Sequence, residues 1–163
     1  MTPHGATDII TASIEIGADP ASVYGLVADI PAMGRRSPEC RRCVWVTGDH
    51  AATGARFKGV NRQGLLRWST ICAVEVADGR ELVFTVVQGA AGRRTRWRYG
   101  FEPISGGTRV TESCEPVSFK RSSVLSVVLN VLRGGGDRVE QVRRGMQETL
   151  ANLKREAEAV VVV

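Results

Sequence analysis

The sequence has few aromatic residues and no long apolar run. Aromatic residues make up 6% of its 163 residues. No apolar stretch approaches the roughly 20 residues that a transmembrane helix needs. Residues 1–8 contain neither a basic segment nor an apolar one, so they do not resemble a secretory signal. These absences predict a soluble, cytoplasmic protein.

Cysteine and histidine are also scarce. With no secretory signal, the four cysteines are expected to be reduced thiols rather than a disulfide framework. Cys40 and Cys43 have the spacing of a redox pair or of half a zinc site, but no second CxxC and no suitably spaced histidine pair accompanies them. We therefore expect no metal, while a switchable disulfide stays open. His4 and His50 lie in the tail and beside a turn, which disfavours histidine-based catalysis.

Lysine is nearly absent, and arginine supplies the positive charge. The chain has 19 Arg against three Lys, and its formal net charge is +5. A GC-rich coding bias explains such a ratio as well as phosphate recognition does. Because no zinc-finger, Walker or RNP pattern is present, we expect no nucleic-acid partner.

The residues that are present indicate strands first and a long helix last. Apolar residues alternate with polar ones over 9–16, as in a strand with one buried face. Asp19-Pro20 then provides an N-cap and a first helical proline for a helix that Pro31 ends. Residues 31–42 allow at most one more helical turn before a strand at 43–47.

Residues 48–116 read as a meander of antiparallel strands. Turn residues separate runs of about 8 to 12 residues rich in Val, Thr, Trp, Tyr and Phe. These turns are predicted at Gly48-Asp49, 61–64, Asp78-Gly79, 89–92 and 105–107. The clearest strand spans 93–102, where Thr95, Trp97, Tyr99 and Phe101 form an apolar face and Arg94, Arg96 and Arg98 a basic one. We expect the basic face to be solvated, with contact to the anionic lipid surface of a membrane or to a partner as the alternative.

The C-terminal part contains a glycine-flanked apolar segment and an amphipathic helix. Residues 124–132 are almost entirely apolar and precede Gly134-Gly135-Gly136, so they form either a hinged cover or a static core helix. A helix is predicted over 137–158, with an apolar stripe that must lie across the sheet. The predicted organisation is a flexible tail (1–8), one domain (9–158) and an apolar tail (159–163).

This order of elements resembles the START-like or Bet v 1-like (SRPBCC) superfamily, which includes the polyketide cyclase/dehydrase and lipid-transport family. The resemblance spans nearly the whole chain. It is carried by Ala12-Ser13-Ile14-Glu15-Ile16, Asp19-Pro20, Arg67-Trp68, the run from Arg96 to Glu112, and Gly145-Met146 with Thr149-Leu150. It implies an α+β helix-grip fold, in which a curved seven-stranded antiparallel sheet wraps around the long C-terminal helix.

Such a sheet cannot close on one helix everywhere, so an apolar space is expected between them. That space is the expected binding site for a hydrophobic small molecule, such as a lipid, a polyketide or another ring compound. No cofactor is implied. Strand alternation and the helix stripe place these ligand-binding candidates on it: Trp68, Thr70, Cys72, Trp97, Phe101, Val110, Cys114, Met146 and Leu150.

Glu112 and Tyr99 are the candidate catalytic residues. Alternation places Glu112 on the core side, where a carboxylate is costly unless it is paired or has a raised pKa. Tyr99 offers a phenolic hydroxyl to the same space. A non-enzymatic binder is favoured. A cyclase, aromatase or dehydratase that uses these two residues is the first alternative, and a regulatory protein with a vestigial cavity is the second. The chain is expected to be a monomer or a homodimer.

Overall fold

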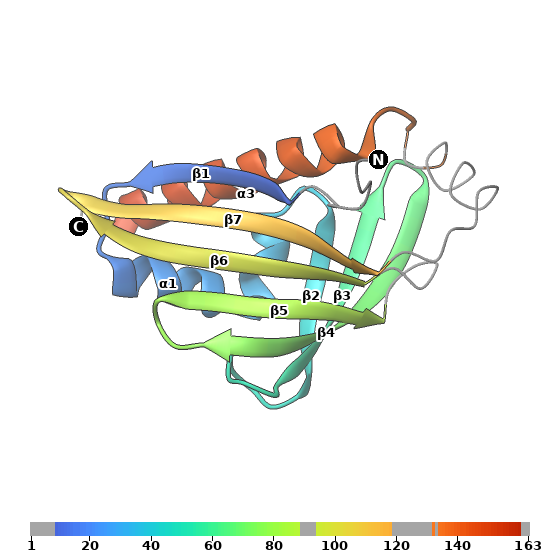
Figure 1. Ribbon diagram of the computed structural model, residues 1–163, viewed down its shortest axis with the longest axis horizontal. Coiled ribbons are helices and arrows are strands. Elements are labelled where there is room, and N and C mark those ends of the chain that lie inside the picture. Colours follow the sequence, from blue (N-terminus) through green and yellow to red (C-terminus); the bar gives the residue numbers. More distant parts are fainter. Residues whose placement is uncertain (1–8, 89–93, 119–131, 133, 161–163) are drawn as a thin grey trace, which may run out of the picture.

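The computed structural model describes residues 9–88, 94–118, 132 and 134–160, and these residues form one seven-stranded antiparallel sheet with its helices on one side (Figure 1). The strands lie side by side in the order β1-β7-β6-β5-β4-β3-β2. Their bounds are β1 (Ile10–Ile16), β2 (Cys40–Thr47), β3 (Arg56–Gln63), β4 (Leu66–Ala77), β5 (Glu81–Gln88), β6 (Arg94–Ile104) and β7 (Gly107–Ser118). The predicted helix-grip fold is confirmed.

The first helix begins where its capping sequence predicts. In α1 (Pro20–Ala28), the Asp19 carboxylate accepts hydrogen bonds from the Ser22 amide at 3.0 Å and from the Ser22 hydroxyl at 2.6 Å. A 3-10 helix, η1 (Ile30–Arg35), follows at once. It packs directly against β2 and brings Met33 and Ser37 to the inner side of the sheet.

Strand β2 begins three residues earlier than predicted. The Ser37 hydroxyl accepts a hydrogen bond from the Cys40 amide at 3.1 Å, and the Glu39 carbonyl accepts one from the Arg62 amide at 2.9 Å. These contacts extend the pairing back to Cys40. The pairing has a register shift between Cys40 and Arg42, which is the mark of a β-bulge.

The β3–β4 turn is tighter than predicted. Strand β3 continues to Gln63, which pairs with Leu66, so only Gly64 and Leu65 form the turn instead of residues 61–64. Gly64 has a φ of 57°, a left-handed conformation that glycine adopts without strain. The polar residues Asn61 and Gln63, expected in the turn, therefore belong to the strand and face the helix.

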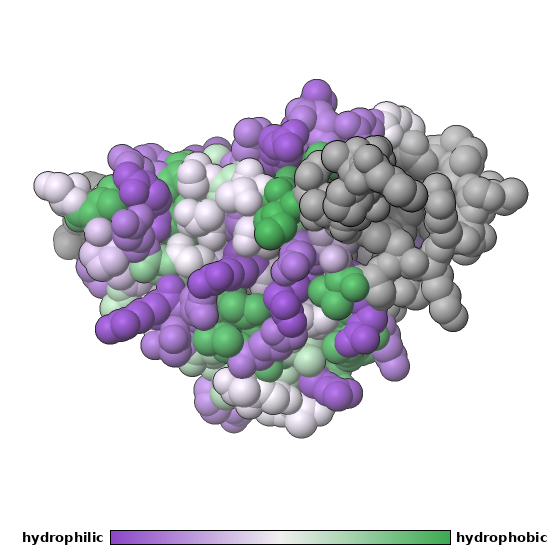
Figure 2. Space-filling view, in the orientation of Figure 1, coloured by the Kyte–Doolittle hydropathy of each residue, from purple (hydrophilic) through white to green (hydrophobic). Residues whose placement is uncertain are grey.

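The arginine row lies on the solvated face of the sheet, as expected. Arg96 pairs with Glu75 at 3.0 Å, and Arg98 pairs with Glu81. Carboxylates on β4 and β5 therefore balance these two arginines of β6. Figure 2 shows hydrophilic and hydrophobic residues interspersed over this side of the molecule.

The C-terminal helix α3 (Arg138–Val160) lies along β1 and also touches α1. It continues two residues past the predicted end at Glu158. Contacts with the end of β1 hold this part: the Gly17 amide donates to Glu158 Oε1 at 2.9 Å, and Lys154 Nζ donates to the Glu15 carbonyl at 2.7 Å. The proposed cover, 124–132, lies outside the described residues except for Leu132.

Candidate functional site: a cavity between the sheet and the last helix

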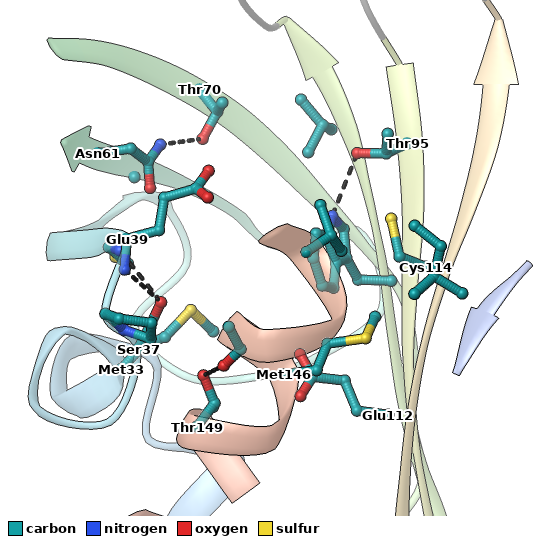
Figure 3. Close-up of a pocket in the computed structure, with 18 of the residues that line it drawn as sticks. Met33, Ser37, Glu39, Asn61, Thr70, Thr95, Glu112, Cys114, Met146 and Thr149 are labelled. Atoms are coloured by element: carbon teal, nitrogen blue, oxygen red, sulfur yellow. Dashed lines mark hydrogen bonds between the residues drawn. The ribbon is translucent and has the colours of Figure 1, made fainter. Parts of the chain in front are cut away.

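A cavity of about 890 Å³, partly open to solvent, lies between the sheet and α3. Its walls come from the N-terminal half of α3, from η1 and β2, and from the inward positions of β3 to β7 (Figure 3). The inward positions at this end of the sheet include several small residues, which leave the space unfilled: Cys40, Cys43, Gly59, Thr70, Cys72, Thr95 and Cys114. The cavity is therefore a consequence of side-chain size on a curved sheet.

The structure brings most of the predicted site residues to this cavity and leaves three elsewhere. Those that line it are Trp68, Thr70, Cys72, Trp97, Tyr99, Glu112, Cys114 and Met146. Phe101, Val110 and Leu150 face the same side of the sheet or helix, but they are buried in the packed core. Alternation identifies the correct face along a strand, but it does not show where along the strand the void ends.

Glu112 and Tyr99 form a buried pair on adjacent strands. They are register partners in the β6–β7 pairing, and the Tyr99 hydroxyl donates a hydrogen bond to Glu112 Oε1 at 2.6 Å. Glu112 and Tyr99 are 3% and 5% exposed. Among the described residues, Glu112 Oε2 has no hydrogen-bond partner. The pair is therefore an incompletely satisfied polar group in a largely apolar environment.

Burial determines the protonation of this pair. It raises the pKa of the Glu112 carboxyl to about 8, although the hydrogen bond from Tyr99 acts in the opposite direction. Burial and the neighbouring carboxyl also raise the pKa of the Tyr99 phenol well above its ordinary value. At neutral pH the prevailing form thus has a protonated Glu112 and a neutral Tyr99. Such a carboxylic acid can donate a hydrogen bond or a proton.

A polar network that sequence reasoning missed connects α3 to β3 and to Glu39, the residue before β2. The Arg138 guanidinium contacts Glu39 Oε1 at 3.2 Å and donates to Gln63 Oε1 at 2.8 Å. Gln63 Nε2 in turn donates to Gln141 Oε1 at 3.4 Å. These side chains line the cavity and come from segments far apart in sequence. One signal was available, because an arginine in the first turn of a helix opposes the helix dipole and needs another reason to be there.

All four cysteines line the cavity as free thiols. The Sγ atoms of Cys40 and Cys43 are 3.3 Å apart, and Cys43 Sγ lies 3.9 Å from Met33 Sδ. In the part of the chain that the structure describes, no group of three or more His, Cys, Asp or Glu side chains is placed to hold a metal ion. The sequence did not place Cys40, Cys43 and Met33 on the cavity. The predicted strand began at Cys43 and so left out Cys40, and the packing of η1, which contains Met33, against β2 is a tertiary contact.

Comparisons with known proteins agree with this architecture. The sequence profile of the family described as polyketide cyclase / dehydrase and lipid transport matches residues 7–158. Cgl2372 from Corynebacterium glutamicum, titled a Polyketide_cyc-like protein, is 29% identical with a TM-score of 0.57, and the match covers 94% of this chain and 93% of that one. No curated protein matches the sequence.

Two further solved structures share the fold at lower identity. Major latex-like protein 151 from Panax ginseng is 12% identical with a TM-score of 0.70, over 94% of this chain and 99% of that one. The di-domain ARO/CYC protein StfQ from the steffimycin biosynthetic pathway is 15% identical with a TM-score of 0.69, and the match covers 95% of this chain and 52% of that one. None of the helices in the described part of the chain combines the length and apolar character needed to cross a bilayer.

Proposed function

Since the chain belongs to the polyketide cyclase / dehydrase and lipid transport family, we propose that its cavity binds a hydrophobic small molecule, such as a lipid, a polyketide or another ring compound. The observation that carries this proposal is a largely apolar cavity of about 890 Å³ containing one buried, incompletely satisfied acid. Ligand pockets commonly measure about 300 to 1,000 Å³ and combine apolar walls with few polar groups. A cavity of this size supports a binding role better than a vestigial one.

The polar pair defines the kind of ligand expected. A protonated Glu112 donates from the oxygen that Tyr99 leaves free, so the ligand should carry a carbonyl or hydroxyl oxygen as an acceptor. Trp68 and Trp97 provide flat apolar walls, which favour a ring system. The bound molecule is therefore expected to be mostly apolar with an oxygen that reaches Glu112.

Native mass spectrometry of the protein purified from its own host tests the binding role. A co-purifying apolar molecule, retained in the native spectrum and released on denaturation, is the expected result. The ligand should then bind at least about tenfold more weakly to the Glu112→Lys variant. The lysine ammonium would place a buried charge where the ligand oxygen is expected to lie. Glu115→Gln is the matched control, because Glu115 lies on the opposite, solvated face of the same strand. Equal loss of affinity in both variants would contradict the proposal.

An enzymatic role is the second candidate, and the buried acid itself favours it. A carboxyl with a pKa near neutrality inside a cavity is suited to general acid catalysis. In a cyclase, aromatase or dehydratase reaction, Glu112 would protonate a carbonyl or a departing hydroxyl oxygen, while Tyr99 holds the carboxyl in position. The StfQ likeness concerns the fold and is consistent with this chemistry.

The variant Glu112→Gln separates binding from catalysis. Glutamine keeps the shape and can accept the Tyr99 hydrogen bond, but it cannot transfer a proton. An enzyme should retain ligand affinity within about threefold and lose turnover by a factor of about 100 or more. If the wild-type protein turns over no ligand that it binds, the simple binding role stands.

A further inference from the structure

Cys40 and Cys43 face the same cavity although their spacing along a strand does not by itself allow it. In an unbroken strand, residues three apart point to opposite faces. The register shift between Cys40 and Arg42 inserts Arg41 as an extra residue against β3. Consequently both cysteines are buried, whereas Arg41 and Arg42 are exposed.

Tertiary contacts hold this bulge in place. The helix η1 lies so close that a Cβ atom on Gly34 would stand 2.5 Å from the Arg41 carbonyl oxygen. The Ser37 hydroxyl accepts hydrogen bonds from the amides of Cys40 and Glu39, at 3.1 Å and 3.3 Å. The approach of the two thiols is thus built into the packing of η1 on β2.

The two thiols are not equivalent. The hydrogen bond between the two sulfur atoms lowers the pKa of Cys40, whereas the same interaction raises the pKa of Cys43. Burial raises the pKa of Cys72 and of Cys114 to about 12. Since the thiolate is the nucleophile, Cys40 is the cavity cysteine best placed to react first, with Cys43 in contact to resolve the product.

We propose that Cys40 and Cys43 are a redox-active dithiol, which hydrogen peroxide converts to a disulfide in the cavity wall. The Cys40 thiolate attacks a peroxide oxygen, so that an S–O bond forms, the O–O bond breaks and the departing hydroxide takes a proton to become water. The Cys43 thiol then attacks the Cys40 sulfenic acid, so that the S–S bond forms, the S–O bond breaks and a second water leaves. Overall, the two thiols lose two electrons and two protons, and the peroxide takes up these electrons and protons to become two water molecules.

The geometry requires only a small movement. The sulfur atoms must approach from 3.3 Å to the bond length of about 2.05 Å. Oxidant must arrive through the cavity, because Cys40 and Cys43 are 6% and 3% exposed. This gives a corollary that rests on the proposed function: a molecule bound in the cavity should slow the oxidation.

Peptide mapping of the full-length protein tests the dithiol. The reduced protein is treated with one equivalent of hydrogen peroxide, alkylated and digested with trypsin, which cuts after Arg41 and Arg42 and so separates the two cysteines. The expected result is a disulfide-linked pair of peptides, 37–41 with 43–56, which dithiothreitol releases. Cys72 and Cys114 serve as internal controls and should react at least about tenfold more slowly.

Two variants assign the roles of the thiols. Cys43→Ser should accumulate a sulfenic acid on Cys40 that dimedone traps, and Cys40→Ser should leave Cys43 unreacted over the same time. Circular dichroism shows whether each variant is folded. Oxidation of all four cysteines at similar rates, or disulfides formed mainly between molecules, would overturn the proposal.

The corollary has its own readout. The fluorescent dye 1-anilinonaphthalene-8-sulfonate is used as the cavity probe, and its binding is measured before oxidation begins. Bound dye should slow formation of the linked peptides several-fold. If the dye does not bind, this counts against the proposed function, while the dithiol result stands. If the dye binds but does not slow the oxidation, the inference that the oxidant reaches Cys40 and Cys43 through the cavity is wrong.

Discussion

The same helix and sheet are solidly packed at one end and hollow at the other. In the C-terminal half of α3, Leu150 and Leu153 are 1% exposed and pack in one core with Val110. The rings of Tyr24 and Phe101 meet edge to face there, with their centroids 5.4 Å apart. In the N-terminal half of α3, Met146 instead lines the cavity.

The difference lies in the residues and not in the architecture. Both ends use inward positions of the same strands, but large aliphatic and aromatic side chains fill the space at one end. At the other end, cysteine, threonine and glycine stand among aromatic side chains such as Trp68 and Trp97 and leave part of the space open. Among the residues that the structure describes, the one buried carboxyl, Glu112, lies at the open end. One end of the molecule thus provides stability, while the other keeps a space that packing alone would have closed.

The largest expected effect is the pH dependence of the free energy of unfolding that arises from Glu112 at the hollow end. Its pKa rises from an ordinary 4.5 to about 8 on folding, so between these values the folded state binds more protons than the unfolded state. The free energy of unfolding should therefore fall as the pH rises through this range, by about 5 kcal/mol at about 1.4 kcal/mol per unit.

Comparing Glu112→Gln with the wild type isolates this effect. Urea unfolding from pH 4 to pH 9 should show similar stability at pH 4 and a growing advantage for the variant up to about pH 8. The solvated Glu115→Gln variant should run parallel to the wild type. A constant difference between the Glu112 variant and the wild type at every pH would mean that this carboxyl titrates normally.

The next largest effect is the loss of stability when either of two buried residues on successive turns of α3 is shortened to alanine. Leu150→Ala at the packed end should cost about 3 to 4 kcal/mol, because it creates a new void in a dense core. Met146→Ala should cost less, about 1 to 2 kcal/mol, since the methionine already borders a cavity and has fewer partners to lose. Urea unfolding midpoints at constant m-value measure both. Equal costs would show that the two ends are packed alike.

The smallest effect comes from adding one methyl group to glycines at the two ends. At Gly107 a Cβ would meet the Ile16 carbonyl oxygen at 2.0 Å, a backbone contact, so Gly107→Ala should cost about 2 to 3 kcal/mol. At Gly59 the nearest atom is the Thr70 hydroxyl oxygen at 3.0 Å, a side chain beside open space, so Gly59→Ala should cost under about 1 kcal/mol.

Gly100→Ala is the control for this pair, because a Cβ there meets nothing within 4 Å. Thermal unfolding of the three variants should rank them with Gly107→Ala least stable. If the Gly59 variant loses as much stability as the Gly107 variant, the cavity wall is as rigid as the packed core.

Strand alternation predicted the inward face of β6 and β7, and with it the positions of Tyr99, Glu112 and Cys114 in the cavity. It did not predict that Glu112 and Tyr99 bond to each other, because that depends on the register between two strands. It also missed the contact of Cys40 with Cys43, since a bulge breaks the period of two on which alternation rests. The Arg138 network was missed for a related reason, because its members meet only after the helix docks.

The sequence by itself determined the order of the elements and which face of each is buried, because hydrophobic periodicity, caps and turn glycines act over a few residues. The tertiary structure alone decided where the interior stays empty and which side chains meet across it. Those outcomes depend on strand register, on the bulge in β2 and on the summed volume of side chains from distant segments, and no local pattern encodes such a sum.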